Sequence, residues 1–450
     1  MMKQILIIIL ISLFTVSCNE TEIEEPLTNL LATFGDQPSV SKDYNNNIFV
    51  VFGNKESVYI ANSNDEGESF SEPSLVGELK GLYLGYSSGP RIAITKNFTV
   101  VTAMNKKGNY FAWSKSNTQD NWSEPVRVND IDGSAAEVLG DLTATPNGNL
   151  FAVWIDTRVL EDEKHTKHSQ PEKEHKSSPI APKTEEELDK MTPQGITIRD
   201  LYEKIGDIPE NTRLTFFGDE EENILWVFLD SEGNAVKAES MDEFKKFRER
   251  NAGKIKPKGK IYLSSSEDGG KSWSKSRMVY RSPEGSVCEC CKPSITSDGK
   301  GVLTVMFRNN IGGSRDLHFT TSIDRGKTFA EPEKLGTGTW KINGCPMDGG
   351  GLMVNKAGDL STIWQRKGEI FTANSSEEEQ LIGKGRAPFI AGNDQQTYIV
   401  FARGEDIMSI DSENSKPIKI GTGSSPKVLS LVDGAIQFWV SEAGISYRKI

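Results

Sequence analysis

The stretch SEDGGKSW at Ser266–Trp273 decides the fold, because its pattern occurs three times in this chain of 450 residues. The other two copies are SNDEGESF at Ser63–Phe70 and SIDRGKTF at Ser322–Phe329. In the shared pattern Ser-x-Asp-x-Gly-x-x-Trp/Phe, the Asp caps its own turn, the Gly accepts a positive φ and the aromatic ring packs beneath. Each copy therefore predicts a tight turn between two strands. A weaker fourth copy, KSNTQDNW at Lys115–Trp122, has Asn117 in place of the Asp.

Short apolar strands flank these turns in a regular order of four strands per unit, which is the pattern of an all-β propeller. The last unit has three strands before the chain stops, and we expect NLLATFG near the N-terminus to supply its outer strand and close the ring. The seven units begin at QPSVS, at GPRIAIT (Gly89), at GDLTATP (Gly140), at CKPSITS (Cys291), at CPMDGGG (Cys345), at RAPFIAG (Arg386) and at SPKVLSL (Ser425).

The repeated turns resemble the Asp-box, or BNR, repeats of the sialidase superfamily of β-propellers. Sialidases proper have six blades, so six is the alternative to the seven four-stranded blades predicted here. The propeller is expected to span residues 28–158 and 259–450.

Blade three is interrupted between Arg158 and Gly259. Residues 159–191 form a charged, Pro-containing linker that lacks an apolar period and is expected to be flexible. Residues 192–258 predict a small α+β insert with two strands and two helices. The linker histidines could hold a metal, although solvated polar residues are the simpler interpretation; they are His165, His168 and His175.

The N-terminus is typical of an exported lipoprotein. Residues 1–17 carry a basic start, an apolar run too short to cross a bilayer, and small residues before Cys18. We expect lipid on Cys18, an acidic tether over 18–27, and a place on the outer membrane, facing the cell surface or the periplasm. A cleaved signal with an incidental cysteine is the alternative. The net charge of −12 argues against nucleic acid as a partner.

The sialidase resemblance implies three arginines that hold a sialic acid carboxylate, a tyrosine nucleophile and an aspartic general acid. Guanidinium groups suit this task because they bind both carboxylate oxygens at once. The candidates for the channel arginines are Arg91, Arg386, Arg308 and Arg315. No late inner strand offers the tyrosine, and no aspartic acid can be assigned, so the catalytic residues stay unassigned.

Three of the five cysteines lie in VCECCKPS, and a fourth follows about one blade later. Since the inner strands of adjacent blades converge at the channel mouth, we expect Cys288, Cys290, Cys291 and Cys345 to meet there. Disulfides, a soft-metal or redox site for copper or zinc, and inert thiols all remain open.

VCECCKPS, FRNNIGGSRD and NGCPMDGGG together resemble a group of exported sialidase-like propellers with a Cys-x-Cys-Cys element. We expect Asp316 to lie near this end of the channel and Asp348 to face it, as ligand-binding residues. The leading hypothesis is a lipid-anchored propeller that binds a ligand or soft metal at a Cys-lined channel mouth. Exo-α-sialidase activity toward a glycan is the second hypothesis. A scaffold whose insert binds a protein of unidentified nature is the third.

Overall fold

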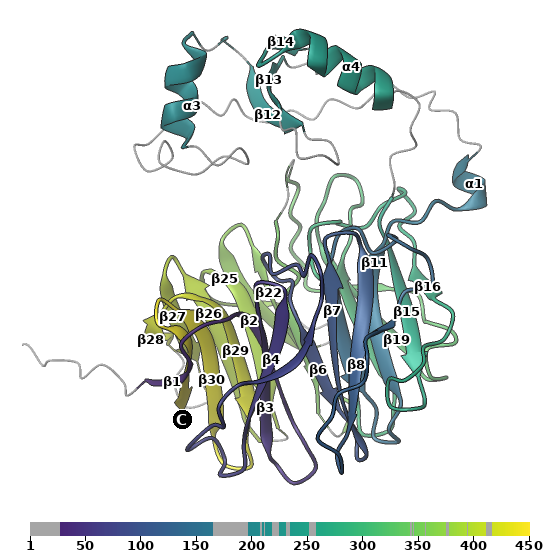
Figure 1. Cartoon of the computed structure of the whole chain (residues 1–450), viewed down its shortest axis with the longest axis vertical. Helices are drawn as coiled ribbons and strands as arrows, with labels where there is room; N and C mark the ends of the chain where they lie inside the picture. Colours follow the sequence, from purple (N-terminus) through teal and green to yellow (C-terminus); the bar gives the residue numbers. More distant parts are fainter. Residues whose placement is uncertain are drawn as a thin grey trace, which may run out of the picture.

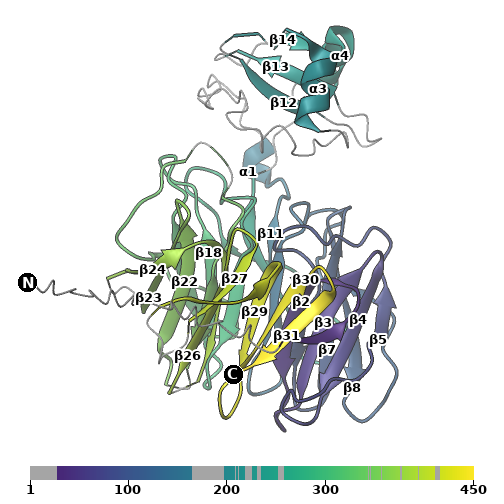
Figure 2. The same cartoon turned by 90° about the vertical axis from the view of Figure 1, so that its left-hand side faces the viewer.

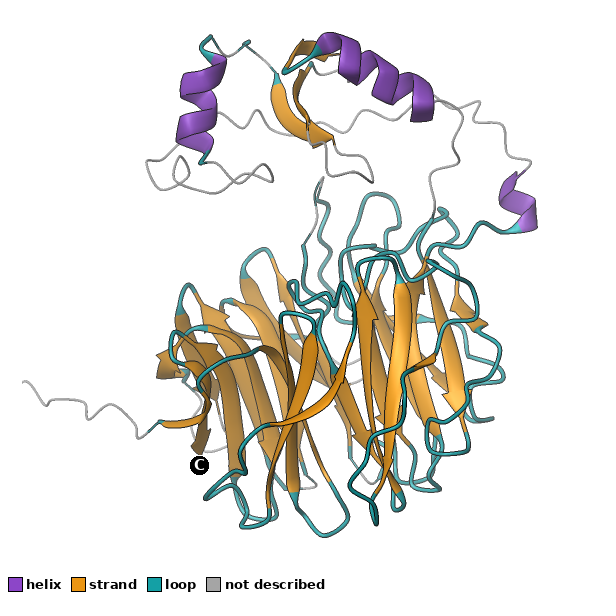
Figure 3. Ribbon diagram, in the orientation of Figure 1, coloured by secondary structure: helices purple, strands orange, loops and turns teal. Residues whose placement is uncertain are grey.

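The computed structural model shows a ring of β-sheets with a small α+β insert beyond one end (Figures 1 and 3). It describes residues 28–164, 197–207, 209–210, 212–217, 225–230, 235–251, 258–342, 344, 346–355, 357–374, 378–393, 395–410 and 416–450. Within these ranges, no helix is long and apolar enough to cross a membrane.

Seven four-stranded antiparallel sheets form the blades, which confirms the predicted fold and blade count. Blade one holds β2 (Asp36–Lys42), β3 (Ile48–Asn54), β4 (Ser57–Ser63) and β5 (Ser74–Glu78). Blade two holds β6 (Arg91–Ile94), β7 (Phe98–Asn105), β8 (Asn109–Ser116) and β9 (Val126–Arg127). Blade three holds β10 (Gly140–Ala144), β11 (Leu150–Asp156), β15 (Lys260–Ser266) and β16 (Arg277–Tyr280).

The remaining blades follow the same order from the channel outward. Blade four holds β17 (Ser294–Ser297), β18 (Leu303–Arg308), β19 (Leu317–Ser322) and β20 (Glu333–Lys334). Blade five holds β21 (Gly351–Val354), β22 (Leu360–Arg366), β23 (Glu369–Asn374) and β24 (Gln380–Lys384). Blade six holds β25 (Arg386–Gly392), β26 (Thr397–Arg403), β27 (Asp406–Ile410) and β28 (Ile418–Thr422).

The last blade joins the two ends of the chain. It contains β29 (Ser424–Ser430), β30 (Ala435–Ser441) and β31 (Gly444–Lys449), and β1 (Asn29–Ala32) is its outer strand. Asn29 lies opposite Tyr447 in this antiparallel pair. The expected closure of the ring by NLLATFG is therefore confirmed.

Apolar side chains fill the space between neighbouring blades. One such layer joins Val51 and Ile60 of blade one to Ile92 and Trp113 of blade two. Each large apolar side chain that is buried in this way contributes about 1.5–3 kcal/mol. Because every blade packs against two others, the ring fixes where each inner strand begins.

The three repeated segments adopt the same turn between the third and fourth strands of their blades. In SEDGGKSW the Ser266 hydroxyl accepts a hydrogen bond from the Gly270 N–H at 2.8 Å and donates one to Asp268 at 2.8 Å. The φ of Gly270 is +88°, in the region that glycine tolerates best. In the weaker copy, the Asn117 amide instead donates to the carbonyl of Thr95 on a neighbouring loop.

The described part of the insert has three strands, one more than expected. It comprises α3 (Ile198–Ile205), β12 (Arg213–Phe217), β13 (Leu225–Leu229), β14 (Ala235–Ala238) and α4 (Met241–Asn251) (Figure 2). The missed strand, AVKA, is too short to show a clear alternation in the sequence. A small core of its own, including Leu201, Trp226 and Phe228, holds the insert together.

The structure describes the first residues of the predicted linker. A short helix, α1 (Glu161–Lys164), begins it, and the Glu163 carboxylate forms a buried 3.0 Å ion pair with the Lys260 amine. This pair ties the start of the insertion to the strand at which the propeller resumes. The three linker histidines lie outside the described residues.

Candidate functional site: a charged channel beside a cysteine turn

A cavity of about 200 Å³ occupies the channel at the centre of the ring. Each of the seven blades contributes at least one residue of its inner strand to the cavity wall. They include Ser39, Arg91, Asp141, Ser294, Gly351, Phe389 and Lys427.

Proline precedes five of these seven wall residues, and in three blades it coincides with a bulge. The register shifts between Asp36 and Ser39 and between Ser424 and Lys427, with a matching shift in blade six. Proline has no N–H to give to the neighbouring strand, so a bulge at this point costs the sheet little. Bulges re-aim the side chain that follows, which here is the one that lines the cavity.

Asp141 is shared by two cations of the cavity wall. Its carboxylate lies 3.1 Å from the Lys292 amine and 3.5 Å from the Arg91 guanidinium. The remaining Arg91 nitrogens donate to backbone carbonyls, including that of Ser87 at 2.7 Å. One carboxylate thus balances two positive charges.

Lys427 is the third cation of the wall. Its amine donates to the Pro426 carbonyl at 3.1 Å, and no carboxylate of the described residues lies within ion-pair distance of it. Burial, and then the charges of Arg91 and Lys292, lower the pKa of Lys427 to about 7. Three basic side chains, Arg91, Lys292 and Lys427, therefore line the cavity together with the carboxyl groups of Asp141 and Asp348.

Asp348 lines the same cavity but is 3% exposed, and its carboxylate accepts hydrogen bonds from the backbone N–H groups of Ala387 (2.8 Å) and Gly350 (3.1 Å). Burial raises its pKa. Asp348 thus connects the loop of blade five to the bulge of blade six.

The loop around Asp348 corrects one strand boundary. The inner strand of blade five begins at Gly351, not at Cys345 as the segment CPMDGGG suggested. The reason is a close approach of the backbone: a side chain at Gly349 would place its Cβ 2.0 Å from the Lys292 carbonyl oxygen. The preceding residues therefore form a loop packed against blade four.

Two of the four candidate arginines are engaged by the protein itself. Arg308, 2% exposed, donates to the backbone carbonyls of Asp348 (2.9 Å) and Arg315 (2.6 Å). Arg91 is engaged in the same manner. Neither guanidinium group has a pair of free N–H groups with which to bind both oxygens of a substrate carboxylate. Arg91 and Arg308 therefore give no support to the predicted binding of a sialic acid carboxylate.

The other candidates lie at different places. Arg386 is exposed, with its guanidinium carbon 5.3 Å from the centre of the Tyr86 ring. Asp316 accepts from the Trp340 N–H at 2.8 Å and pairs with Lys334 at 3.4 Å, and it does not line the cavity. It holds the loop after blade four, whereas Asp348 faces Arg308 only through its backbone carbonyl.

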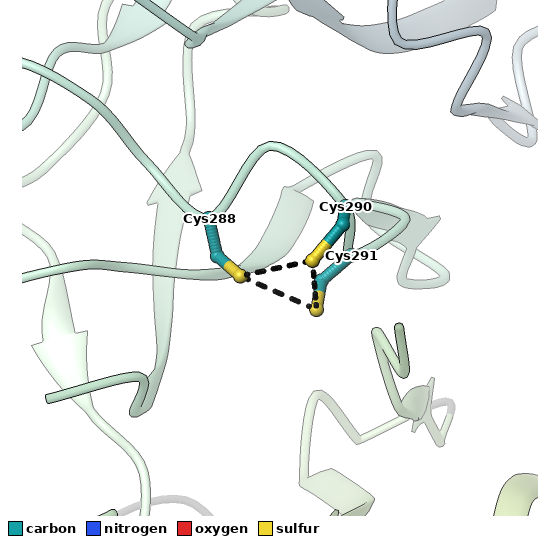
Figure 4. A group of neighbouring side chains, drawn as sticks. All are labelled: Cys288, Cys290 and Cys291. Atoms are coloured by element: carbon teal, nitrogen blue, oxygen red, sulfur yellow. Dashed lines mark hydrogen bonds between the residues drawn. The ribbon is translucent and has the colours of Figure 1, made fainter. Parts of the chain in front are cut away.

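Three cysteine sulfurs meet in the turn that precedes blade four (Figure 4). Cys288 lies 3.6 Å from Cys290 and 3.5 Å from Cys291, sulfur to sulfur. Cys288 and Cys291 are free thiols, whereas Cys290 is disulfide-bonded. Two disulfides within the predicted cluster are thereby ruled out. Cys345 and Cys18 lie outside the described residues.

This oxidation state bears on the copper or zinc hypothesis. All three sulfurs lie within 4.8 Å of one another, which suits one soft metal ion. A sulfur in a disulfide, however, offers no thiolate, so only Cys288 and Cys291 remain as ligands. The described residues do not fit a three-thiolate site in this state.

The two thiols differ in their surroundings. A hydrogen bond with Cys291, followed by the positive charges of Arg315 and Arg308, lowers the pKa of Cys288 to about 7. Burial raises the pKa of Cys291 well above its ordinary value. Cys288 is therefore the thiol that ionises first, and Cys291 remains protonated beside it.

Comparison with solved structures agrees with the fold. The BP39L lectin from Burkholderia pseudomallei is 8% identical, with a TM-score of 0.51, over 92% of this chain and 96% of that chain. Two further structures have lower TM-scores. A leech intramolecular trans-sialidase is 12% identical, with a TM-score of 0.42, over 90% of this chain and 82% of that chain. A protein of unknown function from Dyadobacter fermentans is 13% identical, with a TM-score of 0.40, over 94% of this chain and 97% of that chain. No family model and no curated protein matches the chain. The chain thus has the class of a seven-bladed β-propeller, and these likenesses concern the fold alone.

Sequence reasoning missed three charged residues of the cavity: Asp141, Lys292 and Lys427. A signal for one of them was present, because Lys427, like the candidate Arg91, follows the proline that opens an inner strand. Aligning the seven strand starts would have placed these side chains on one ring.

Proposed function

We propose that this protein binds a small anion, with carboxylate or phosphate chemistry, in the central channel of its propeller. The single observation that carries the proposal is Lys427, a basic residue on the cavity wall next to Arg91 and Lys292 that contacts no carboxylate among the residues the structure describes. Placing like charges together in a buried site is unfavourable unless an anion joins them. An anionic ligand would relieve this repulsion.

The size of the cavity limits the ligand. At about 200 Å³ it is smaller than the sites that enclose drug-sized molecules, which start near roughly 300 Å³. A compact acid fits this volume better than an oligosaccharide does. The proposal therefore replaces the glycan of the second hypothesis with a small solute.

Location at the cell envelope remains part of the proposal and rests on the N-terminal sequence alone. Lipid on Cys18 would tether the propeller through the acidic segment 18–27. Incorporation of labelled palmitate, lost in Cys18→Ser, is the corresponding measurement.

The test is calorimetric titration of the purified propeller with sodium succinate, sodium phosphate and, as a neutral control, glucose. We expect one of the two anions to bind and glucose not to bind. Lys427→Met should weaken the binding roughly ten- to hundredfold, because a hydrogen bond to a charged group is worth about 1.5–3 kcal/mol. Succinate and phosphate distinguish the two chemistries.

Lys300→Met is the matched control, since Lys300 is exposed in a turn and does not line the cavity. It should bind like the wild type. The proposal fails if neither anion binds, or if Lys427→Met and the wild type bind equally well. Hydrolysis of a fluorogenic sialoside by the wild type would instead restore the sialidase hypothesis.

A further inference from the structure

The cysteine turn contains sulfur in two oxidation states within contact distance. The free thiol of Cys288 lies 3.6 Å from the sulfur of Cys290, which is disulfide-bonded, and 3.5 Å from the free thiol of Cys291. Figure 4 shows the three sulfurs pointing toward one another. A thiolate exchanges with a disulfide by attacking one of its sulfurs, and Cys288 has such a sulfur beside it.

The spacing of the two free thiols suits a reversible bond between them. Cys288 and Cys291 are three residues apart, the Cys-x-x-Cys spacing in which one thiol is activated and the other is held nearby. The charges of Arg308 and Arg315 act on Cys288 and favour its thiolate. Cys291 is thus left as the thiol that resolves a mixed disulfide.

Burial distinguishes the two free thiols from Cys290. Cys288 and Cys291 are each 1% exposed, whereas Cys290 is half-buried. A reagent from outside therefore meets Cys290 before it meets either free thiol. In an oxidising compartment this arrangement would shield a dithiol from direct attack.

The backbone holds the turn in place. The N–H of Cys288 donates to the Arg308 carbonyl at 2.9 Å, and the N–H of Val287 donates to the Gly259 carbonyl at 3.0 Å. The Glu289 carboxylate accepts in turn from the Gly259 N–H at 3.1 Å. These bonds hold the turn against the end of β18 and against the residue before β15, and so keep the three sulfurs together.

We propose that Cys288, Cys290 and Cys291 form a thiol–disulfide relay in which the buried Cys288/Cys291 dithiol exchanges electrons with the disulfide of Cys290. The relay is independent of the anion site, because none of the three sulfur-bearing residues lines the cavity.

The exchange balances without an outside oxidant. The Cys288 thiolate attacks the Cys290 sulfur, a Cys288–Cys290 bond forms, and the former partner of Cys290 leaves as a thiolate. Cys291 then attacks Cys288, a Cys288–Cys291 bond forms, and Cys290 leaves as a thiolate. The two protons of the dithiol end on Cys290 and its former partner. Oxidised glutathione, a small disulfide, can then reoxidise that pair and release two molecules of glutathione.

The first test traps the cysteines of the wild type without added reductant. The protein is held at about pH 8, where Cys288 is largely ionised, quenched in acid and alkylated with N-ethylmaleimide, and peptide mass spectrometry locates the label and the disulfides. We expect a fraction of the molecules to carry label on Cys290 and a Cys288–Cys291 disulfide. Cys288→Ser should reduce the Cys290 label to background, and Cys291→Ser should stop the exchange at Cys288–Cys290.

The second test measures the rate at which oxidised glutathione converts the Cys288/Cys291 dithiol to a disulfide. Cys290→Ser should slow this rate roughly tenfold or more, because the accessible entry point is lost. Circular dichroism checks that each variant folds, and the wild-type trapping experiment does not depend on any variant. The relay is refuted if Cys290 stays unlabelled in the wild type, if the two rates are equal, or if the purified protein holds stoichiometric copper on these thiols.

Discussion

At the scale of single residues, the Lys427 amine controls both the charge of the channel and its response to pH. Its pKa is about 7 in the folded protein, below the ordinary value of 10.5 for lysine. The unfolded chain therefore binds more protons at this side chain between about pH 7 and pH 10.5. As the pH falls from about 10.5 to about 7, the free energy of unfolding therefore decreases because of Lys427, and below about pH 7 this side chain causes no further change.

Lys427→Met should consequently be more stable than the wild type at about pH 6, by roughly 1–3 kcal/mol in the free energy of unfolding. The difference should shrink as the pH rises toward about 10, where the wild-type amine is neutral in the folded state and the cost of burying its charge disappears. Thermal unfolding of both proteins across this range measures it. A difference that stays constant with pH would contradict the cause assigned here, and Lys300→Met provides the reference.

The cysteines show what single residues in a sequence can and cannot disclose. The spacing of Cys288, Cys290 and Cys291 predicted that they lie together, whereas their place at the channel mouth with Cys345 stays a prediction. Their oxidation states could not be predicted, because pairing depends on which sulfurs approach in space and two of the three remain free thiols. The hydrogen bonds from Arg308 to backbone carbonyls could not be predicted from the sequence either, since they depend on the path of the loop around Asp348 in the next blade.

At the scale of elements, the repeated turn is the most predictable part of the chain. The Ser and the Asp form hydrogen bonds within the turn, and the Gly adopts a positive φ. Four or five consecutive residues therefore suffice to specify the turn. The starts of inner strands were less predictable: the loop before Gly351 depends on contact with Lys292 in another blade. The strand AVKA of the insert was missed because its pairing with β13 is not encoded in a local pattern.

The Ser266 hydroxyl should contribute measurably to the free energy of unfolding. Ser266→Ala leaves the Gly270 N–H, at a buried position, without its acceptor, which costs about 1–3 kcal/mol. Chemical denaturation of both proteins should show this loss at unchanged denaturant sensitivity. Ser116→Ala, in the weaker copy, removes a hydroxyl bonded to Thr118 rather than to a glycine N–H and should have a smaller effect. Equal losses would indicate that the shared turn has no special role.

At the scale of the whole molecule, seven blades and their closure follow from counting strand units, which is why the sequence predicted them. The ring is a sum of similar local units, so an error in one unit does not change the architecture. The charged residues of the channel could not be predicted in the same way. They come from the inner strands of different blades, which are up to hundreds of residues apart in the sequence, so no short segment contains them all.

Removal of β1 should destabilise the ring far more than removal of the tether. A chain that starts after Gly35 leaves the outer edge of β31 unpaired, lacks Leu31 and exposes the rest of the apolar cluster around Tyr447. A chain that starts after Glu25 keeps the whole blade. We expect the first truncation to unfold several degrees lower by calorimetry, and equal melting temperatures would disprove closure by β1.

The pairing of β1 with β31 also sets an order of events during biosynthesis. Asn29 is made early, and its partner Tyr447 is made near the end of the chain. At about 5–20 residues per second, a ribosome needs roughly 20–80 s to pass from one to the other. For that interval β1 has no strand to join, and the edge of blade seven does not yet exist. The pairing of β1 with β31 must therefore be the last step in closing the ring. Until then, folding requires that β1 does not pair with another strand.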